Sequence, residues 1–174
     1  MLNVVSGLFE TGQTVRLEAG QTAFRTGDRV RVMYLVVEGG VDLVRYTASG
    51  TSLILNRVSP GNVLAEASAY SEQYHCDGLA STKTRLRSLS VSQFLERVHS
   101  SADIAHFWAA QLARELQNAR MQSEIRSLKT VAERLDAWLG LPNKLPLRGK
   151  MQDLAHVLGV SREALYRELA RRRN

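Results

Sequence analysis

Four residues near the end of the chain combine charge, hydrogen-bonding capacity and helical spacing: Ser161, Arg162, Glu163 and Arg167. An arginine can give two parallel hydrogen bonds to the edge of a guanine, and a glutamate can accept one from the amine of a cytosine. On a helix, Arg162 and Arg167 lie about 140° apart, so both reach the floor of a groove only if the helix enters by its amino end. These residue types therefore indicate the reading of base edges in double-stranded DNA.

Other basic and aromatic residues near these four suit a less specific role. We expect Tyr166, Lys150 and Arg172 to contact phosphates, which adds salt-dependent affinity without selectivity. Residues 142–174 hold eight Lys or Arg against three Asp or Glu, whereas the rest of the chain is nearly balanced at 15 against 14. This local excess of positive charge favours a polyanionic partner. A solvated basic face without a partner is the alternative.

A helix-turn-helix would position these side chains. Residues 151–173 read MQDLAHVLGVSREALYRELARRR, in which Leu154 and Ala155 fall on one helical face. Gly159 permits a sharp turn, and the small side chain of Ala155 allows a second helix to approach closely. Ser161 can cap that second helix. An ordinary helical hairpin with an exposed basic face is the alternative.

A long helix is expected from about residue 101 to residue 123. Small and apolar residues recur along it at alternating spacings of four and three, which is typical of a seam between two helices. We predict that a homodimer forms through Ala109, Leu112, Leu116 and Ala119. The alternative is a single helix buried in a bundle.

Two apolar patterns flank this seam. Ile104, Phe107 and Trp108 form a patch at the beginning of the long helix and are expected to pack on the preceding domain. A further helix is predicted over residues 128–139 by its apolar spacing, and Gly140 marks its end.

The first hundred residues predict β-structure. Short apolar runs such as MYLVVEGG, VDLVRYT and SLILNRV are separated by glycine corners at intervals of about ten residues, which favours a double-stranded β-helix, or jelly roll. No helix is expected before residue 92, where Ser92 can cap a short one. The fold class is therefore α+β, with a β-roll over residues 1–99, a dimerisation helix over 100–124 and a helix-turn-helix domain over 125–174.

These parts, in this order, resemble the Crp/Fnr superfamily of bacterial transcription regulators. FRTGDRVRVMYLVVEGGVDLVRYTASGTSLILNRVSPGNVLAEASAYSE is similar to their cyclic-nucleotide-binding-type sensor β-roll, and LAHVLGVSREALYREL is similar to their DNA-reading motif. The resemblance implies a homodimeric regulator that binds palindromic DNA with half-sites of the TGTGA type. It adds RNA polymerase as a candidate partner. Most of the β-hairpin wing that usually follows the motif is expected to be missing.

The β-roll departs from the family members that bind cyclic AMP. The resemblance places a candidate ligand pocket at Glu66, Ala67, His75, Cys76 and Asp77. Glu66 matches the glutamate that holds the ribose hydroxyl, but Cys76 and Asp77 stand where those relatives carry the Arg-Ser pair that holds the phosphate. An aspartate repels a phosphate, and no nearby arginine replaces the lost one. We therefore expect that cyclic AMP and cyclic GMP do not bind tightly and that there is no resident cofactor, and the sequence does not identify the effector.

Alternative functions are few. His75 and Cys76 would suit a haem or redox sensor, although one thiol and one imidazole do not complete a metal site, and no metal is expected. A jelly-roll enzyme would need several histidines on its strands, and the β segment has only His75, so no enzyme is expected. A ligand-binding regulatory module that does not touch DNA is the other alternative. No apolar stretch is long enough to span a membrane, and we expect a cytoplasmic protein without a membrane partner.

Overall fold

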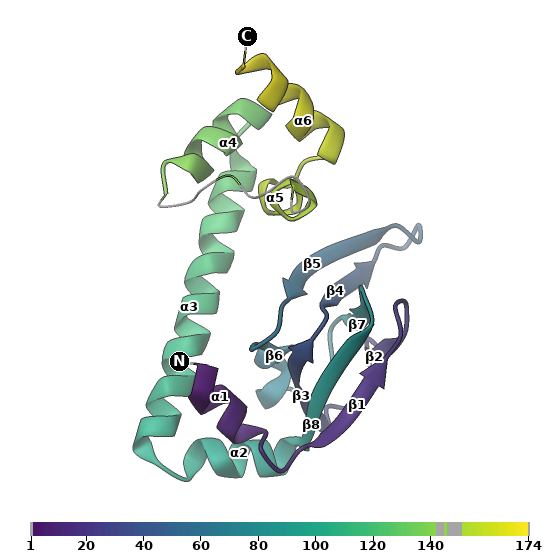
Figure 1. Ribbon diagram of the computed structural model, residues 1–174, viewed down its shortest axis with the longest axis vertical. Helices are drawn as coiled ribbons and strands as arrows, with labels where there is room; N and C mark the ends of the chain where they lie inside the picture. The colour runs from purple at the N-terminus through teal and green to yellow at the C-terminus, as the bar shows by residue number, and fades with distance from the viewer. Residues whose placement is uncertain (1, 142–144, 146–150, 174) are drawn as a thin grey trace. The chain divides into compact units, whose positions relative to one another are not determined.

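The computed structural model describes residues 2–141, 145 and 151–173. The chain forms two compact units, Met1–Leu112 and Ala113–Asn174, whose elements are labelled in Figure 1. In the part of the chain that is described, no helix is long and apolar enough to cross a membrane.

The first unit is built on two four-stranded antiparallel sheets. One sheet has the strand order β1-β8-β3-β6 and the other has the order β2-β7-β4-β5. The strands are β1 (Gln13–Leu17), β2 (Thr22–Phe24), β3 (Val32–Glu38), β4 (Val41–Tyr46), β5 (Ser52–Val58), β6 (Val63–Leu64), β7 (Asp77–Ala80) and β8 (Thr84–Ser90). Most strands pair with partners distant in sequence, as a double-stranded β-helix requires, which confirms the predicted β-roll.

Apolar side chains from both sheets and three helices form one core. Met33 and Val36 on β3 and Leu86 on β8 are fully buried. The helices are α1 (Leu2–Leu8), α2 (Val91–His99) and the first half of α3 (Ala102–Ser127). An aromatic series runs through them: the Phe9 and Phe94 ring centroids lie 5.6 Å apart, and Trp108 meets Phe94 edge-on at 5.0 Å. The expected packing of the Trp108 patch on the β domain is thereby confirmed.

Two helices in this unit correct the sequence-based expectation. The structure has α1 near the amino end and a short 3-10 helix, η1 (Glu66–Tyr70), although no helix was expected before residue 92. Seven residues with Gly7 among them give little local helical signal, and α1 is stabilised mainly by burial of Val5 and Leu8 in the core. Arg97 on α2 also donates to the Leu8 carbonyl oxygen at 2.6 Å.

The cap of α2 is a second correction. Ser90, not Ser92, is its N-cap, and the Ser90 hydroxyl accepts a hydrogen bond from the Gln93 amide at 3.2 Å. Ser90 is also the last residue of β8. The helix can therefore begin two residues earlier than expected, because the strand ends in the extended conformation that an N-cap needs.

The second unit is helical. It contains the second half of α3, α4 (Val131–Leu139), α5 (Met151–Leu158) and α6 (Arg162–Arg171). Ala155, Leu158 and Leu165 are fully buried together with Leu135, so α4, α5 and α6 share one small core. The predicted helix-turn-helix is confirmed in α5 and α6.

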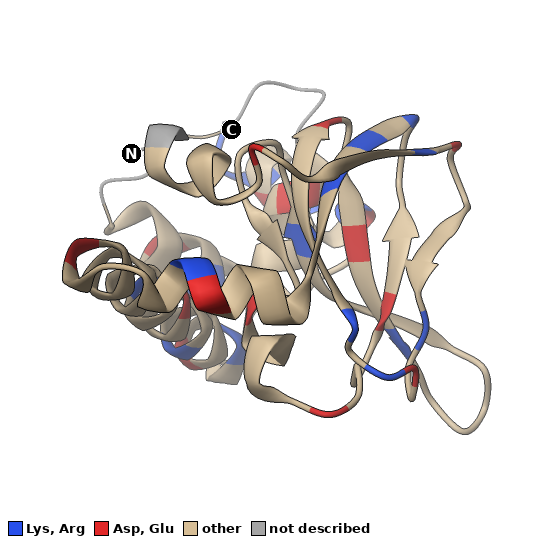
Figure 2. Ribbon diagram, turned by 90° about the horizontal axis from the view of Figure 1, so that it is seen from below, with Lys and Arg blue, Asp and Glu red and all other residues tan. Residues whose placement is uncertain are grey.

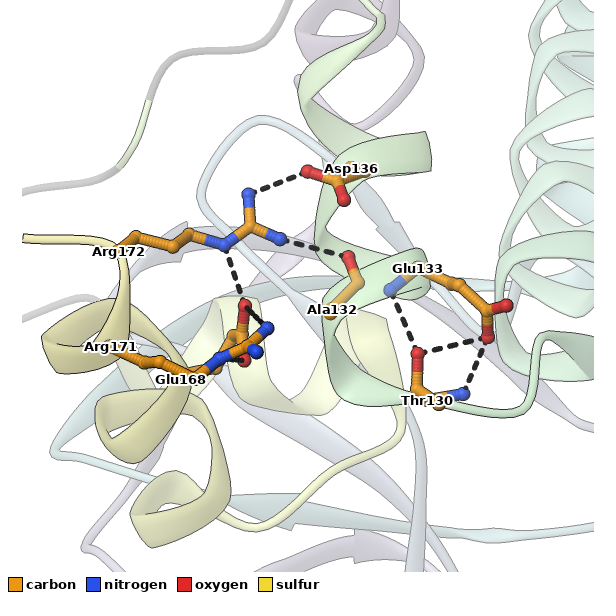
Figure 3. Close-up of polar contacts among 7 residues, drawn as sticks. All are labelled: Thr130, Ala132, Glu133, Asp136, Glu168, Arg171 and Arg172. Carbon is orange, nitrogen blue, oxygen red and sulfur yellow. Dashed lines mark hydrogen bonds and ion pairs between the residues drawn. The ribbon is translucent and has the colours of Figure 1, made fainter.

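One boundary in this unit differs from the prediction. Leu128 was placed in the second helix, but α3 continues to Ser127 and α4 starts only after Thr130. The reason is a capping box: the Thr130 hydroxyl accepts from the Glu133 amide at 3.1 Å, and the Glu133 carboxylate accepts from the Thr130 amide at 2.8 Å (Figure 3). Gly140 follows the last residue of α4, as expected.

Gly39, in the turn between β3 and β4, supplies a stability test. Its φ is +81°, and a Cβ there would press on the Lys83 carbonyl oxygen. We expect Gly39→Ala to lower the free energy of unfolding by about 2–5 kcal/mol, as backbone strain and overpacking add. Gly20→Ala is the control, because its φ is +86° but a Cβ would meet nothing within 4 Å, and it should cost about 1–2 kcal/mol. If urea unfolding showed the same loss of unfolding free energy for both variants, the close approach of Gly39 to the Lys83 carbonyl would be contradicted.

Candidate functional site

The turn of the helix-turn-helix is held by two arginines from neighbouring helices. Arg126 on α3 donates to the His156 carbonyl oxygen at 2.8 Å, and Arg134 on α4 donates to the carbonyl oxygens of Leu158 and Gly159, both at 3.1 Å. The Leu158 and Gly159 carbonyls lie at and just beyond the end of α5, where they lack helical partners and carry partial negative charge. The His156 carbonyl also accepts from the Gly159 amide at 3.0 Å, so Arg126 adds a second donor to it. The two guanidinium groups therefore fix the point from which α6 departs.

The turn itself depends on Gly159. Its φ is +65°, a left-handed conformation, and a Cβ there would lie 3.0 Å from Cγ of Arg126. Sequence reasoning found Gly159 but missed Arg126 and Arg134. Their distance in sequence from the turn gave no spacing signal that could have identified them.

The amino end of α6 presents the predicted DNA-reading side chains. Ser161 is the N-cap, and its hydroxyl accepts from the Ala164 amide at 3.1 Å. Arg162, Glu163 and Arg167 are exposed. Hydrogen bonds from its own backbone amide and from the Ser161 hydroxyl lower the pKa of Glu163, which keeps the carboxylate an acceptor near neutral pH.

Tyr166 lies between Arg162 and Arg167 in the sequence of this helix. It is half-buried, and the guanidinium carbon of Arg162 lies 5.4 Å from the centroid of its ring. A cation over an aromatic face is attracted by the ring quadrupole, so Tyr166 helps to hold the Arg162 side chain on the helix surface. Lys150, the other expected phosphate contact before the turn, lies outside the described residues.

Arg172 has a different environment from the other predicted contacts. Its guanidinium donates to Glu168 at 2.7 Å, to Asp136 at 2.6 Å and to the Ala132 carbonyl oxygen at 3.1 Å (Figure 3). Arg171 donates to the same Glu168 carboxylate, with two contacts of 3.1 Å. Sequence reasoning missed Glu168, although its spacing of four residues to Arg172 is that of a helical ion pair.

Glu168 is the most enclosed charged group of this set. It is only 9% exposed, and hydrogen bonds first from Arg171 and then from Arg172 lower its pKa. A buried carboxylate is tolerated when it is paired and hydrogen-bonded in this way.

The predicted dimer residues lie along α3. Ala109 and Ala119 are exposed, and the Leu116 residue is 52% exposed, which is high for a large apolar residue. Leu112 is half-buried and packs on the core of the first unit. Three of the four residues are thus accessible to another chain, while Leu112 also serves the chain's own core.

The candidate ligand residues of the β-roll divide between two segments. Glu66 and Ala67 begin η1, and His75, Cys76 and Asp77 lead into β7. His75 is exposed and Cys76 is only 1% exposed, so the two adjacent side chains have different surroundings. Burial raises the pKa of the Cys76 thiol, which keeps it protonated and disfavours redox chemistry.

Asp77 is bound within the roll. One oxygen of its carboxylate accepts from both the amide and the hydroxyl of Thr26, each at 2.8 Å. The side chain is therefore anchored as an acceptor at the position where cyclic-AMP-binding relatives were inferred to carry a phosphate-binding serine.

An arginine does lie beside this segment, contrary to the expectation that none would. Arg45 on β4 donates twice to the His75 carbonyl oxygen, at 3.2 and 3.0 Å. The pairing of β4 with β7, which sets Val44 opposite Asp77, brings it there. Strand pairing of this kind is not visible in sequence spacing.

The β-roll carries both signs of charge. Acidic and basic residues are interspersed along its strands (Figure 2). Among the residues described, no group of three or more His, Cys, Asp or Glu side chains could hold a metal ion.

Comparison with known sequences identifies the β-roll. The profile of the cyclic nucleotide-binding domain matches residues 14–101, just over half of the chain. The chain belongs to the cyclic nucleotide-binding domain family. Within it, the cAMP-activated global transcriptional regulator CRP of Haemophilus influenzae is 25% identical over 161 residues, covering 86% of this chain and 72% of that protein. The cyclic AMP receptor protein of Thermus thermophilus is 29% identical over 157 residues, with coverages of 86% and 72%.

A solved structure extends the likeness over almost all of the chain. The c-di-GMP-responsive global regulator CLP of Xanthomonas campestris matches with a TM-score of 0.70 and 19% identity, covering 99% of this chain and 92% of that one. It has the same CRP-like fold of β-roll, long helix and carboxy-terminal helices. The chain is thus a CRP/FNR-family transcription regulator at low sequence identity, and these relatives are regulators and not enzymes.

Proposed function

We propose that this regulator is a homodimer that binds palindromic DNA through α6 and senses an effector other than a cyclic nucleotide in its β-roll. The observation that carries the proposal is the amino end of α6, where Arg162, Glu163 and Arg167 are exposed just after a turn fixed by Arg126 and Arg134. Side chains at this end of the second helix of a helix-turn-helix reach base edges in the major groove.

The effector proposal is supported by the surroundings of Cys76 and Asp77 in the β-roll. Cys76 is buried, and Asp77 is hydrogen-bonded to Thr26, so neither offers the donors that a cyclic phosphate needs. Two donors of Arg45 are directed at the His75 carbonyl oxygen. The relatives respond to different effectors, cAMP for CRP of Haemophilus influenzae and the cyclic dinucleotide c-di-GMP for CLP of Xanthomonas campestris.

The first prediction concerns base reading. Selection from random DNA should return a palindrome with G·C pairs in half-sites of the TGTGA type, centred about 10 base pairs apart. Arg162→Ala and Arg167→Ala should each weaken the free energy of binding to this site by about 1–3 kcal/mol and reduce the preference for one base at one position. Arg173→Ala is the control, because this exposed residue lies beyond α6 and should weaken all sequences alike. A double Arg162→Ala, Arg167→Ala variant that selects the wild-type site would contradict the proposal and favour a ligand-binding module that does not read DNA.

The second prediction concerns the dimer. A two-fold axis along α3 buries the same residue on both chains, so Leu116→Glu should weaken dimerisation at least about 100-fold by removing two buried leucines. Sedimentation at micromolar concentration should then show monomers. Gln117→Glu adds the same charge at the neighbouring exposed position and should remain dimeric. If Leu116→Glu also remained dimeric, the interface would lie elsewhere.

The third prediction concerns the effector. Calorimetry should show no binding of cyclic AMP or cyclic GMP at micromolar concentration, because the phosphate would meet the Asp77 carboxylate. The cyclic AMP receptor protein of Thermus thermophilus serves as the positive control for the assay. Micromolar binding that disappears in Glu66→Ala would overturn this expectation.

A further inference from the structure

The carboxy end of α6 is tied to α4 by polar contacts that span long distances in sequence. The guanidinium of Arg172 bonds to Asp136, 36 positions earlier, and to the Ala132 carbonyl, 40 positions earlier. The same guanidinium bonds to Glu168, which faces the interior of the unit with 9% of its surface exposed (Figure 3). We call Glu168, Arg172 and Asp136 the α6 clamp.

The clamp acts on the rotation of α6 about its own axis, together with the fully buried Leu165. Glu168 directly follows Arg167, and consecutive helical residues point about 100° apart. Holding Glu168 on the inner side therefore sets the direction in which Arg167 projects. A rotation of about 20° would move atoms about 6 Å from the axis by about 2 Å, more than a bidentate contact to a base tolerates.

Electrostatics alone would make two of the three clamp residues unfavourable for DNA binding. Glu168 and Asp136 are acids in a unit that is proposed to bind a polyanion, and removal of an acid normally raises affinity for DNA. Their pairing with Arg172 also occupies donors of that arginine, whose side chain stays 30% exposed.

We propose that the α6 clamp positions the recognition helix, so that Glu168, Arg172 and Asp136 contribute to sequence preference without touching DNA. Arg172 is then a positioning residue and not a phosphate contact. This inference rests on the proposed function, and its test needs one measurement that does not involve DNA.

The measurement without DNA is a double-mutant cycle in the 174-residue chain. Asp136→Asn and Arg172→Gln, singly and together, are compared by hydrogen exchange of the α6 amides. If the pair holds the helix, the protection factors of the double variant should differ by roughly threefold or more from those expected when the two single-variant effects act independently. Additive effects would show that the Asp136 and Arg172 side chains do not act together, which overturns the proposal.

The measurement with DNA compares the selected palindrome with random duplex. Asp136→Asn should lower the preference for the palindrome by roughly tenfold, the discrimination of about one base pair, and leave affinity for random duplex equal or higher. Glu124→Gln is the matched control: it removes an acid from the exposed part of α3 in the same unit and should keep the preference. Asp136 is 64% exposed, so its variant should fold even if Arg172→Gln does not.

Salt dependence separates positioning from phosphate contact. Arg172→Gln should leave the slope of log affinity against log salt unchanged, whereas Arg173→Ala should reduce it by about one. A slope reduced equally by both, or an unchanged preference in Asp136→Asn, would overturn the inference while the proposed function stands. A wild-type protein that prefers no sequence would overturn both, even if the exchange cycle showed coupling.

Discussion

The carbonyl groups at the end of α5 are the constraint on which the DNA-reading surface depends. Helix ends leave such groups without partners, and burying them unsatisfied would be costly. Arg126 supplies a donor to the Val157 carbonyl, and Arg134 supplies donors to the next two carbonyls, those of Leu158 and Gly159. Each long side chain therefore satisfies a backbone group and ties a separate helix to the turn. The direction of α6 follows from this arrangement, since its N-cap, Ser161, comes two residues after Gly159.

The two ends of α6 handle charge in opposite ways. At the amino end, arginines and a glutamate are exposed and available to a partner. At the carboxy end, the exposed Arg172 bonds to the buried carboxylate of Glu168 and to Asp136 on α4. The positive charge there is thus partly offset by acids that lie beside it, one of them outside the segment counted from the sequence. The β-roll uses its charges structurally as well, since Arg57 lies 3.6 Å from Asp42 and Arg85 pairs with Glu38.

Much of the fold was predictable because it follows from the spacing of apolar residues and glycines along short stretches of the chain. Glycine corners marked the strands of the roll, and Ala155, Gly159 and Ser161 marked the helix-turn-helix. Features that depend on distant partners were not predictable. The α1 helix is held by tertiary burial of Val5 and Leu8, and Arg45 reaches His75 only through the pairing of β4 with β7. The contacts of Arg172 with Asp136 and Ala132 likewise join positions 36 and 40 residues apart.

Ser90 serves at once as the last residue of β8 and the N-cap of α2. No residue separates the strand from the helix. A change in the direction of α2 would therefore disturb β8, which is paired on both sides, with β1 and β3. The next junction is also short, because only Ser100 and Ser101 separate α2 from α3. A change in the angle between α2 and the first turns of α3 would therefore require changes in the backbone torsions of those two serines and a shift of Trp108 on the Phe94 ring.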